Sequence, residues 1–465
     1  MKGWRLAAAG AAALLLAGCA VPVRRADTRV AAAGYVPGGI PAHLGGRPVR
    51  RRDEALAWWR EFHNPALEGL VAEGLADNPG LAAARARIAR AKAQAAAANG
   101  AFLPHLEVTP GATRQAFPAG PYGFPPYTVY ELTGTISYNP GLFGARHYAF
   151  RNGRALAAYQ RAEADAARLT LAQNIVDAAI TLAGLEARIA NTQALAAGEA
   201  RLLRLVRGEF AAGAIPMLPV LQQKSEYLAT AAQLPPLEGQ ASAARHSLAV
   251  LAGVLPADFA APPFRLGDFS LPAEISLSVP SRFLENRPDI RAARALVAAR
   301  HAALGQAAAA LYPQLSLSAQ GGYASEAINT LFEPGAALWT LAGNLLTPLL
   351  DGGELRASRQ AARAGLAVAL DDYRNTVLTA FQQVADALRH VEEDRAATEQ
   401  AREAAAAARA TFRLARRQFA LGGIDYNSVL TAEITWRQAR LALIQARTRR
   451  LLDNAALSAA MARAD

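Results

Sequence analysis

The chain has 465 residues, of which 52% are hydrophobic and 19% charged, so it is long enough to bury a sizeable core. Its 49 lysines and arginines exceed its 38 acidic residues, which gives a formal net charge of +11 at pH 7. The arginines are spread along alanine-rich stretches without interleaved aromatic residues, a pattern typical of solvated helix faces, so we expect no nucleic-acid partner. A single cysteine excludes an intrachain disulfide.

The sequence contains no catalytic or metal-binding motif. The seven histidines lack the mutual spacing of two to four residues that metal sites use, and no cysteine lies near them. There is no GxxxxGK[ST] loop, so no nucleotide-driven motor is predicted. We therefore expect neither an enzyme nor a resident metal or cofactor.

Residues 1–18 have the layout of a secretory signal, with a basic start, an apolar run and small residues before Cys19. The apolar run is shorter than the roughly 20 residues that a membrane-spanning helix needs. Leu16 to Cys19 resembles the bacterial lipobox, and this resemblance implies cleavage before Cys19 and its acylation, while Ala20 favours sorting to the outer membrane. The alternative is an ordinary cleaved signal that leaves an unmodified thiol.

The two halves of the chain are similar at a constant offset of 209 residues. The matching anchors are Pro79 with Pro288, Pro104 with Pro313, and RGEFAAGAIPMLPVL (207–221) with RRQFALGGIDYNSVL (416–430). Three anchors at one spacing predict a tandem duplication. The predicted divisions after the signal are a lipidated extension (19–54), a first repeat (55–254), a Pro-rich linker (255–280) and a second repeat (281–465).

Each half begins with a helix and continues into two strands. Residues 79–100 are strong helix formers without an interior proline, and Pro104 ends the helix. An alternating segment at Leu106 and Val108 follows, then a loop rich in proline and glycine, and then a segment with period two over 128–139. The second half repeats the two strands at 315–323 and 338–346.

The longest predicted elements are two helices at 146–212 and 355–421, each with 67 residues and no proline. At 1.5 Å per residue each would extend about 100 Å, which rules out a compact globular domain. Coiled-coil seams are predicted at Leu171, Ile175, Ala178, Leu182, Leu185 and Ile189, and at Ala380, Val384, Ala387 and Val391. Residues 392–394 are expected on a solvated face. Shorter helices are predicted at 56–76, 234–254 and 440–460.

The strand count predicts an oligomer. Four strands per chain are too few to close an outer-membrane barrel, which takes at least about eight. Two chains would give an almost filled barrel of about eight strands, whereas three would give about twelve and leave a passage. The predicted outer face carries Leu132, Ile136, Tyr138, Leu315, Leu317 and Tyr323. The alternative is a pair of soluble hairpins with one face exposed to solvent.

Four stretches together resemble the lipoprotein branch of the TolC-like outer-membrane efflux protein family. They are residues 58–81, 283–322 with its RPDIRAA sequence, 338–358 with PLLDGG, and 373–388, and the resemblance covers about residues 58–459. It implies a mainly α fold with a transmembrane β-barrel, formed as a homotrimer of about twelve strands. The barrel would continue into a long α-helical periplasmic tunnel, with the short helices forming an equatorial belt.

The resemblance also implies a function. It predicts a passive outer-membrane exit duct, anchored by lipid, for drugs, solvents or metals. A periplasmic adaptor protein would couple the duct to an inner-membrane RND pump. Two alternatives are the duct of a protein-secretion system and a periplasmic coiled-coil scaffold lipoprotein without a pore.

In this family the tunnel narrows where the long helices turn. The corresponding turns are residues 212–220 and 421–430, in which Gly213, Gly422 and Gly423 suit sharp turns and are candidates for adaptor contact.

Asp425 and Tyr426 match the polar and aromatic step of the family's tip motif and are the candidate periplasmic gate. The alternative is that Asp425 only caps the next helix. Thr431 follows Leu430 where the family often has an acidic residue, so no acidic ring is predicted at that level.

Overall fold

The computed structural model describes most of the chain from residue 43 onward. The described residues are 22–23, 28, 43–50, 57–116, 125–271, 274–277 and 280–461. The predicted signal (1–18), Cys19 and most of the extension (19–54) lie outside them, so the lipidation of Cys19 stays a prediction.

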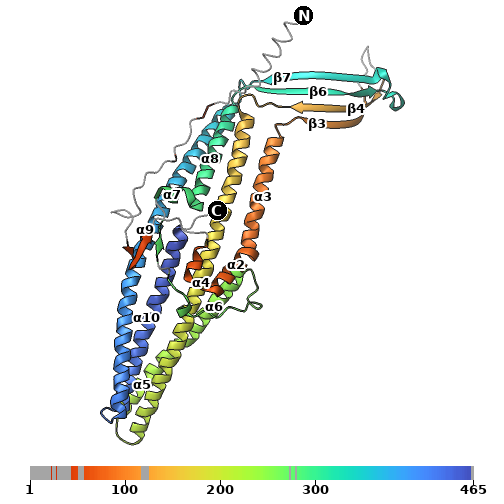
Figure 1. Cartoon of the computed structure of the whole chain (residues 1–465). Coiled ribbons are helices and arrows are strands. Elements are labelled where there is room, and N and C mark those ends of the chain that lie inside the picture. The colour runs from red at the N-terminus through yellow and green to blue at the C-terminus, as the bar shows by residue number, and fades with distance from the viewer. Residues whose placement is uncertain are drawn as a thin grey trace. The chain divides into compact units, whose positions relative to one another are not determined.

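Helices make up most of the described chain, as the mainly α class predicts (Figure 1). The α-helices are α2 (Pro65–Asp77), α3 (Pro79–Gly100), α4 (Ala145–Ala211), α5 (Met217–Ala231), α6 (Leu234–Ala252), α7 (Pro280–Asn286), α8 (Pro288–Ala309), α9 (Glu354–Ala420) and α10 (Tyr426–Met461). Short 3-10 helices are η1 (Trp58–Phe62), η2 (Leu266–Asp268), η3 (Ile328–Thr330) and η4 (Pro334–Ala336). Within the described residues, no helix is apolar enough over a sufficient length to cross a bilayer.

The two longest helices lie within one residue of their predicted bounds. Helices α4 and α9 each contain 67 residues, because neither has a proline to interrupt its backbone hydrogen bonds. Two predictions of shorter helices are wrong. Residues 56–76 are not one helix, since the Asn64 side chain accepts a hydrogen bond from the Leu67 N–H (3.1 Å) and begins α2 after η1. Residues 440–460 belong to the 36-residue α10, which contains neither glycine nor proline.

The chain divides into two compact units, which are described separately. Unit 1 comprises residues 1–29, 87–161 and 292–374, and unit 2 comprises residues 30–86, 162–291 and 375–465.

Unit 1 contains a four-stranded antiparallel sheet that joins the strands of both halves (Figure 1). Its order is β3 (His105–Gln115), β4 (Tyr127–Tyr138), β6 (Gln314–Ser325), β7 (Ala337–Leu346). The four predicted strands are therefore confirmed. Strands β3 and β7 lie at the two edges, and each has one strand partner among the described residues.

The register places the predicted apolar residues on one face of this sheet. Tyr138 lies opposite Leu317 and Leu132 lies opposite Tyr323, and residues directly opposite each other share a face. The same face continues to both edges, through Leu106 (68% exposed) on β3 and Leu341 (73% exposed) on β7. The other face is mainly polar and carries Thr133, Thr135, Ser316, Ser318 and Gln320.

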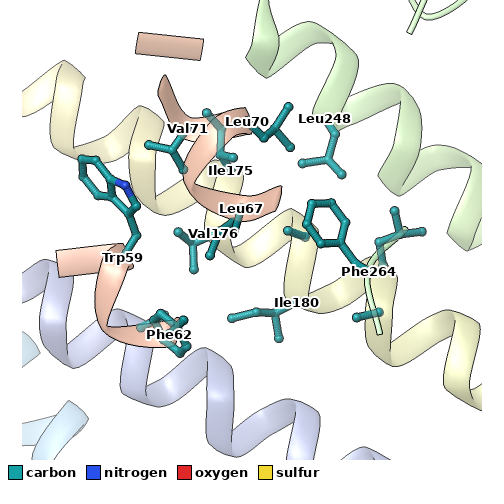
Figure 2. Packing of buried hydrophobic residues seen from close by; sticks show 14 of the residues in the cluster. Trp59, Phe62, Leu67, Leu70, Val71, Ile175, Val176, Ile180, Leu248 and Phe264 are labelled. Carbon is teal, nitrogen blue, oxygen red and sulfur yellow. The ribbon is translucent and has the colours of Figure 1, made fainter. Parts of the chain in front are cut away.

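The core of unit 2 gathers side chains from η1, α2, α4 and α6 (Figure 2). Phe62, Leu67 and Val71 converge on Ile175 and Ile180 of α4, and all five are almost fully buried. Each such side chain contributes about 1.5 to 3 kcal/mol by leaving water. The predicted seam of α4 lies in this core, with its members buried or partly buried against the same cluster.

The Pro-rich segment 255–280 also packs on this core, through Phe264 and Phe269, whose ring centres lie 6.1 Å apart. A small sheet, which the sequence did not predict, forms beside it from β1 (His43–Leu44), β2 (Arg47–Arg50) and β5 (Ile275–Ser276). Strands β2 and β5 are parallel. The predicted linker is therefore docked on unit 2.

The predicted seam of α9 is buried at Val384 and Val391, and it continues through Asp394 and Thr398, each 6% exposed. The prediction that residues 392–394 form a solvated face is therefore wrong for Asp394, although Glu392 and Glu393 are exposed. The reason is the helical period, since positions 391, 394 and 398 repeat at intervals of three and four.

Candidate functional site at the helix turns

Both predicted tip turns lie at the same end of unit 2 (Figure 1). One joins α4 to α5, and the other joins α9 to α10. Gly213 lies in the first turn, whereas Gly422, Gly423, Asp425 and Tyr426 lie together in the second.

The two turns close with the same pattern of backbone hydrogen bonds. In the first, Gly213 donates to the Phe210 carbonyl (2.9 Å) and Ala214 donates to the Glu209 carbonyl (2.9 Å). In the second, Gly422 donates to Phe419 (2.9 Å) and Gly423 donates to Gln418 (2.8 Å). This is a Schellman motif, which needs a left-handed residue after the helix and satisfies its last carbonyls.

The three candidate glycines have different roles. Gly213 and Gly422 have φ angles of 72° and 74°, which side-chain-bearing residues rarely adopt. Gly423 has no such positive φ and contributes its N–H to Gln418. Backbone geometry therefore requires glycine at Gly213 and Gly422 only.

Asp425 caps α10 and remains exposed. Its Oδ1 accepts a hydrogen bond from the Ser428 N–H (2.7 Å), which is the expected contact of an N-cap residue. The hydrogen bonds from Ser428 hold the pKa of Asp425 below its ordinary value, so its carboxylate is charged at neutral pH. The second turn thus presents a fixed negative charge. The first turn has Pro216 at the equivalent position, which offers no side-chain cap.

Tyr426 closes the second turn by packing on the last turn of α9. Its ring centre lies 5.3 Å from that of Phe419, at an interplanar angle of 47°. Directly after it, a polar pocket of about 390 Å³ opens between α9 and α10. Its lining is Ala408, Thr411, Asn427, Ser428, Thr431, Ala432 and Thr435.

The turns are anchored by a small apolar cluster and by buried ion pairs. The cluster contains Leu202, Leu203, Val206, Val220 and Leu430, from α4, α5 and α10. Beyond it, Glu433 of α10 pairs with Arg201 of α4 (2.7 Å) and with Arg437 (3.5 Å). Glu433 is largely buried, and its pair with Arg201 joins α4 to α10, whereas its pair with Arg437 lies within α10.

A second polar feature, which the sequence did not predict, is a group of carboxyls between α4, α9 and α10. The pKa of Asp394 is raised to about 7, chiefly by burial and also by a hydrogen bond and the negative charge of Asp453. The pKa of Asp177 is raised to about 6, chiefly by burial and to a smaller extent by the charge of Asp453. Asp394 is therefore partly protonated around neutral pH.

Comparison with known proteins identifies the class of this chain. The family model described as "Outer membrane efflux protein" matches residues 70–254 and 279–463. The chain therefore belongs to the outer-membrane efflux protein family, whose members are channels and not enzymes.

Two curated relatives illustrate this membership. The pyoverdine export outer membrane protein OpmQ of Pseudomonas aeruginosa is 33% identical over 408 residues, which cover 85% of this chain and 84% of OpmQ. The toluene efflux pump outer membrane protein TtgF of Pseudomonas putida is 28% identical over 392 residues, covering 81% of this chain and 80% of TtgF.

Solved structures show the same fold. The outer-membrane channel OprN matches with a TM-score of 0.85 and 25% identity, covering 94% of this chain and 98% of OprN. The CmeC outer membrane channel of Campylobacter jejuni has a TM-score of 0.85 at 19% identity, and the match covers 96% of this chain and 94% of CmeC. The predicted TolC-like fold of the chain is therefore confirmed.

Proposed function

We propose that the chain is one third of a trimeric outer-membrane exit duct for small-molecule efflux. Its sheet would form part of a closed barrel of about twelve strands, and its long helices would continue the barrel as a periplasmic tunnel. The proposal includes the tandem duplication, which is supported by the identical hydrogen-bond pattern of the two turns.

The observation that carries this proposal is the sheet of unit 1. One of its faces is apolar and exposed from edge to edge, with Trp339 at 77% and Leu345 at 64%. Strands β3 and β7 form its two edges, and among the described residues each pairs with one strand only. Lipid would cover the apolar face, and further copies of the chain would pair the edges, because unpaired backbone groups are costly in a bilayer.

We infer the partners and the transported compounds from the relatives in the family. Relatives are named as outer-membrane components that export pyoverdine, toluene or antibiotics. We infer the same small-molecule class here, delivered by an inner-membrane RND pump through a periplasmic adaptor that contacts the tip turns at Gly213, Gly422 and Gly423. The acylated Cys19 would anchor each copy to outer-membrane lipid.

The test is the assembly and conductance of the full-length protein. Extracted in mild detergent, it should behave as a trimer, and in planar bilayers it should give stepwise conductance. A deletion strain should become sensitive to drugs, solvents or metals. A stable single copy without conductance would indicate the scaffold lipoprotein instead, and a strain defective only in protein secretion would indicate the secretion duct.

We further propose that Asp425 and Tyr426 form the periplasmic gate, with three copies of the Asp425 carboxylate around the threefold axis. Asp425→Asn should keep the N-cap and remove the charge, whereas Asp425→Ala removes both. If the charges act at the gate, both variants should shift ion selectivity toward anions at low salt, where screening is weak. If the Asp425→Asn channel has the same ion selectivity as the wild type, Asp425 only caps α10 and does not act at the gate.

A further inference from the structure

A group of arginines surrounds Trp436 between α9 and α10. Phe412 stacks on the indole, with ring centres 5.5 Å apart and an interplanar angle of 13°. The guanidinium carbon of Arg437 lies 4.4 Å from the centre of the same indole. Those of Arg440 and Arg409 lie at 5.9 Å and 6.0 Å. Three positive charges therefore converge on one ring.

Within the described part of the chain, Arg437 is the one member of this group that has a carboxylate partner. Glu433, the one acidic residue close to it in the sequence of α10, is already bound to Arg201 (2.7 Å) and Arg437 (3.5 Å). The sequence has no Asp or Glu at positions 404–420 of α9 or at 434–452 of α10. Among the described residues, neither Arg409 nor Arg440 forms an ion pair.

The guanidinium groups repel one another. Burial lowers the pKa of Arg440, and the charges of Arg437 and Arg409 lower it further. The ring quadrupole of Trp436 compensates part of this repulsion, since a cation over the face of an indole is attracted to it. An anion bound between the three guanidinium groups would compensate the remaining repulsion.

We propose that Arg409, Arg437 and Arg440 bind a small multivalent oxyanion, with carboxylate or phosphate groups, beside Trp436. The planar fork of a guanidinium matches such groups with two parallel hydrogen bonds. The charges lie within 6.0 Å of one ring centre, and the Arg437 side chain is only 19% exposed. Arg409 and Arg440 are exposed, so an anion can reach them from solvent. Three charges gathered on one ring suit a small anion better than the broad acidic surface of a partner protein.

The site goes beyond the proposed duct function, because anion binding can be measured whether or not the protein conducts. Full-length protein in detergent should be titrated calorimetrically with citrate and with inorganic phosphate at constant ionic strength. The test variant is Arg409→Gln with Arg440→Gln, which keeps Trp436 and Arg437 in place. The matched control is Arg389→Gln with Arg402→Gln, because both arginines lie exposed on α9 and already pair with Glu393 (2.6 Å) and Glu399 (2.5 Å).

Citrate should bind the wild type and the control equally, and the test variant about tenfold or more weakly. The loss of affinity in the test variant should be larger for citrate than for phosphate, because citrate can bind more guanidinium groups at once. Equal citrate affinity in the test variant and the control would overturn the proposal. So would a wild type that binds neither anion but binds an acidic helical peptide, since the cluster would then serve a protein partner.

Discussion

Gly422 and Gly423 are adjacent in the second turn, but the backbone conformation requires glycine at only one of the two positions. Gly422 has a φ of 74° and Gly423 does not have a positive φ. A methyl group on Gly423 would meet nothing closer than the Gln418 carbonyl at 3.4 Å, which is an ordinary contact. The turn therefore depends on one glycine for its backbone conformation.

Gly422→Ala should destabilise the turn locally by about 1 kcal/mol, because a left-handed conformation is strained for alanine. Hydrogen exchange of the amides at 418–423 should rise about fivefold, as expected for that free energy. Gly423→Ala is the matched control and should leave exchange nearly unchanged. Equal effects of the two substitutions would contradict the assignment.

Asp394 illustrates a residue whose environment the sequence misrepresents. The acidic run of residues 392–394 favours a solvated face, but the helical period turns the third carboxyl inward. There it meets Asp453 of a helix far away in the sequence, and such a meeting follows from tertiary packing alone.

The raised pKa values make stability depend on pH. An unfolded Asp titrates near 3.8, so between about pH 4 and pH 7 the native protein holds more protons than the unfolded chain. The stability contributed by the neutral form is thus fully present below about pH 4 and is lost as pH rises through 7.

Asp394→Asn should therefore raise the thermal unfolding midpoint at pH 8 and flatten its change between pH 5 and pH 8. The gain in free energy should be on the order of 1 kcal/mol. Circular dichroism of the helices provides the measurement, with the exposed Asp386 as the site of a control Asn substitution. A pH profile that stays as steep as in the wild type would show that Asp394 is not the group that holds the proton.

At the scale of the elements, the sequence predicted the parts with strong periodicity. Helix α3, the 67-residue helices and the four strands follow from proline positions and from periods of 3.6 and 2. The break at Asn64 and the continuity of α10 were missed, because capping and the absence of a breaker are local signals without periodicity. Strands β1, β2 and β5 are too short to carry a pattern at all.

The candidate site was predictable in part for the same reason. The turn glycines and Asp425 lie in two short stretches that match at a fixed offset, so sequence comparison found them. Two other clusters combine residues from separate helices. One consists of Asp177, Asp394 and Asp453, and the other consists of the arginines around Trp436. No single stretch of sequence contains either constellation.

For the assembled protein, the predicted acylation of Cys19 would provide the anchor in the membrane. One acyl chain gives only marginal membrane binding, whereas two or more give stable anchoring at about 0.8 kcal/mol per buried methylene. Mass spectrometry of the mature protein should find an acylated Cys19 at its N-terminus. Cys19→Ser should lower the amount in the outer membrane severalfold, and an unmodified N-terminal thiol in the wild type would refute the lipobox prediction.

The pairing of β4 with β6 sets an order on folding. Tyr138 lies opposite Leu317, which follows it by 317 − 138 = 179 positions, so the centre of the sheet closes a long loop between the two halves. Such long-range pairing is slow, because the entropy of loop closure is lost before the contact is gained. The first hairpin must therefore wait, unpaired on one side, until β6 is also available, and its apolar residues need protection from aggregation during that delay.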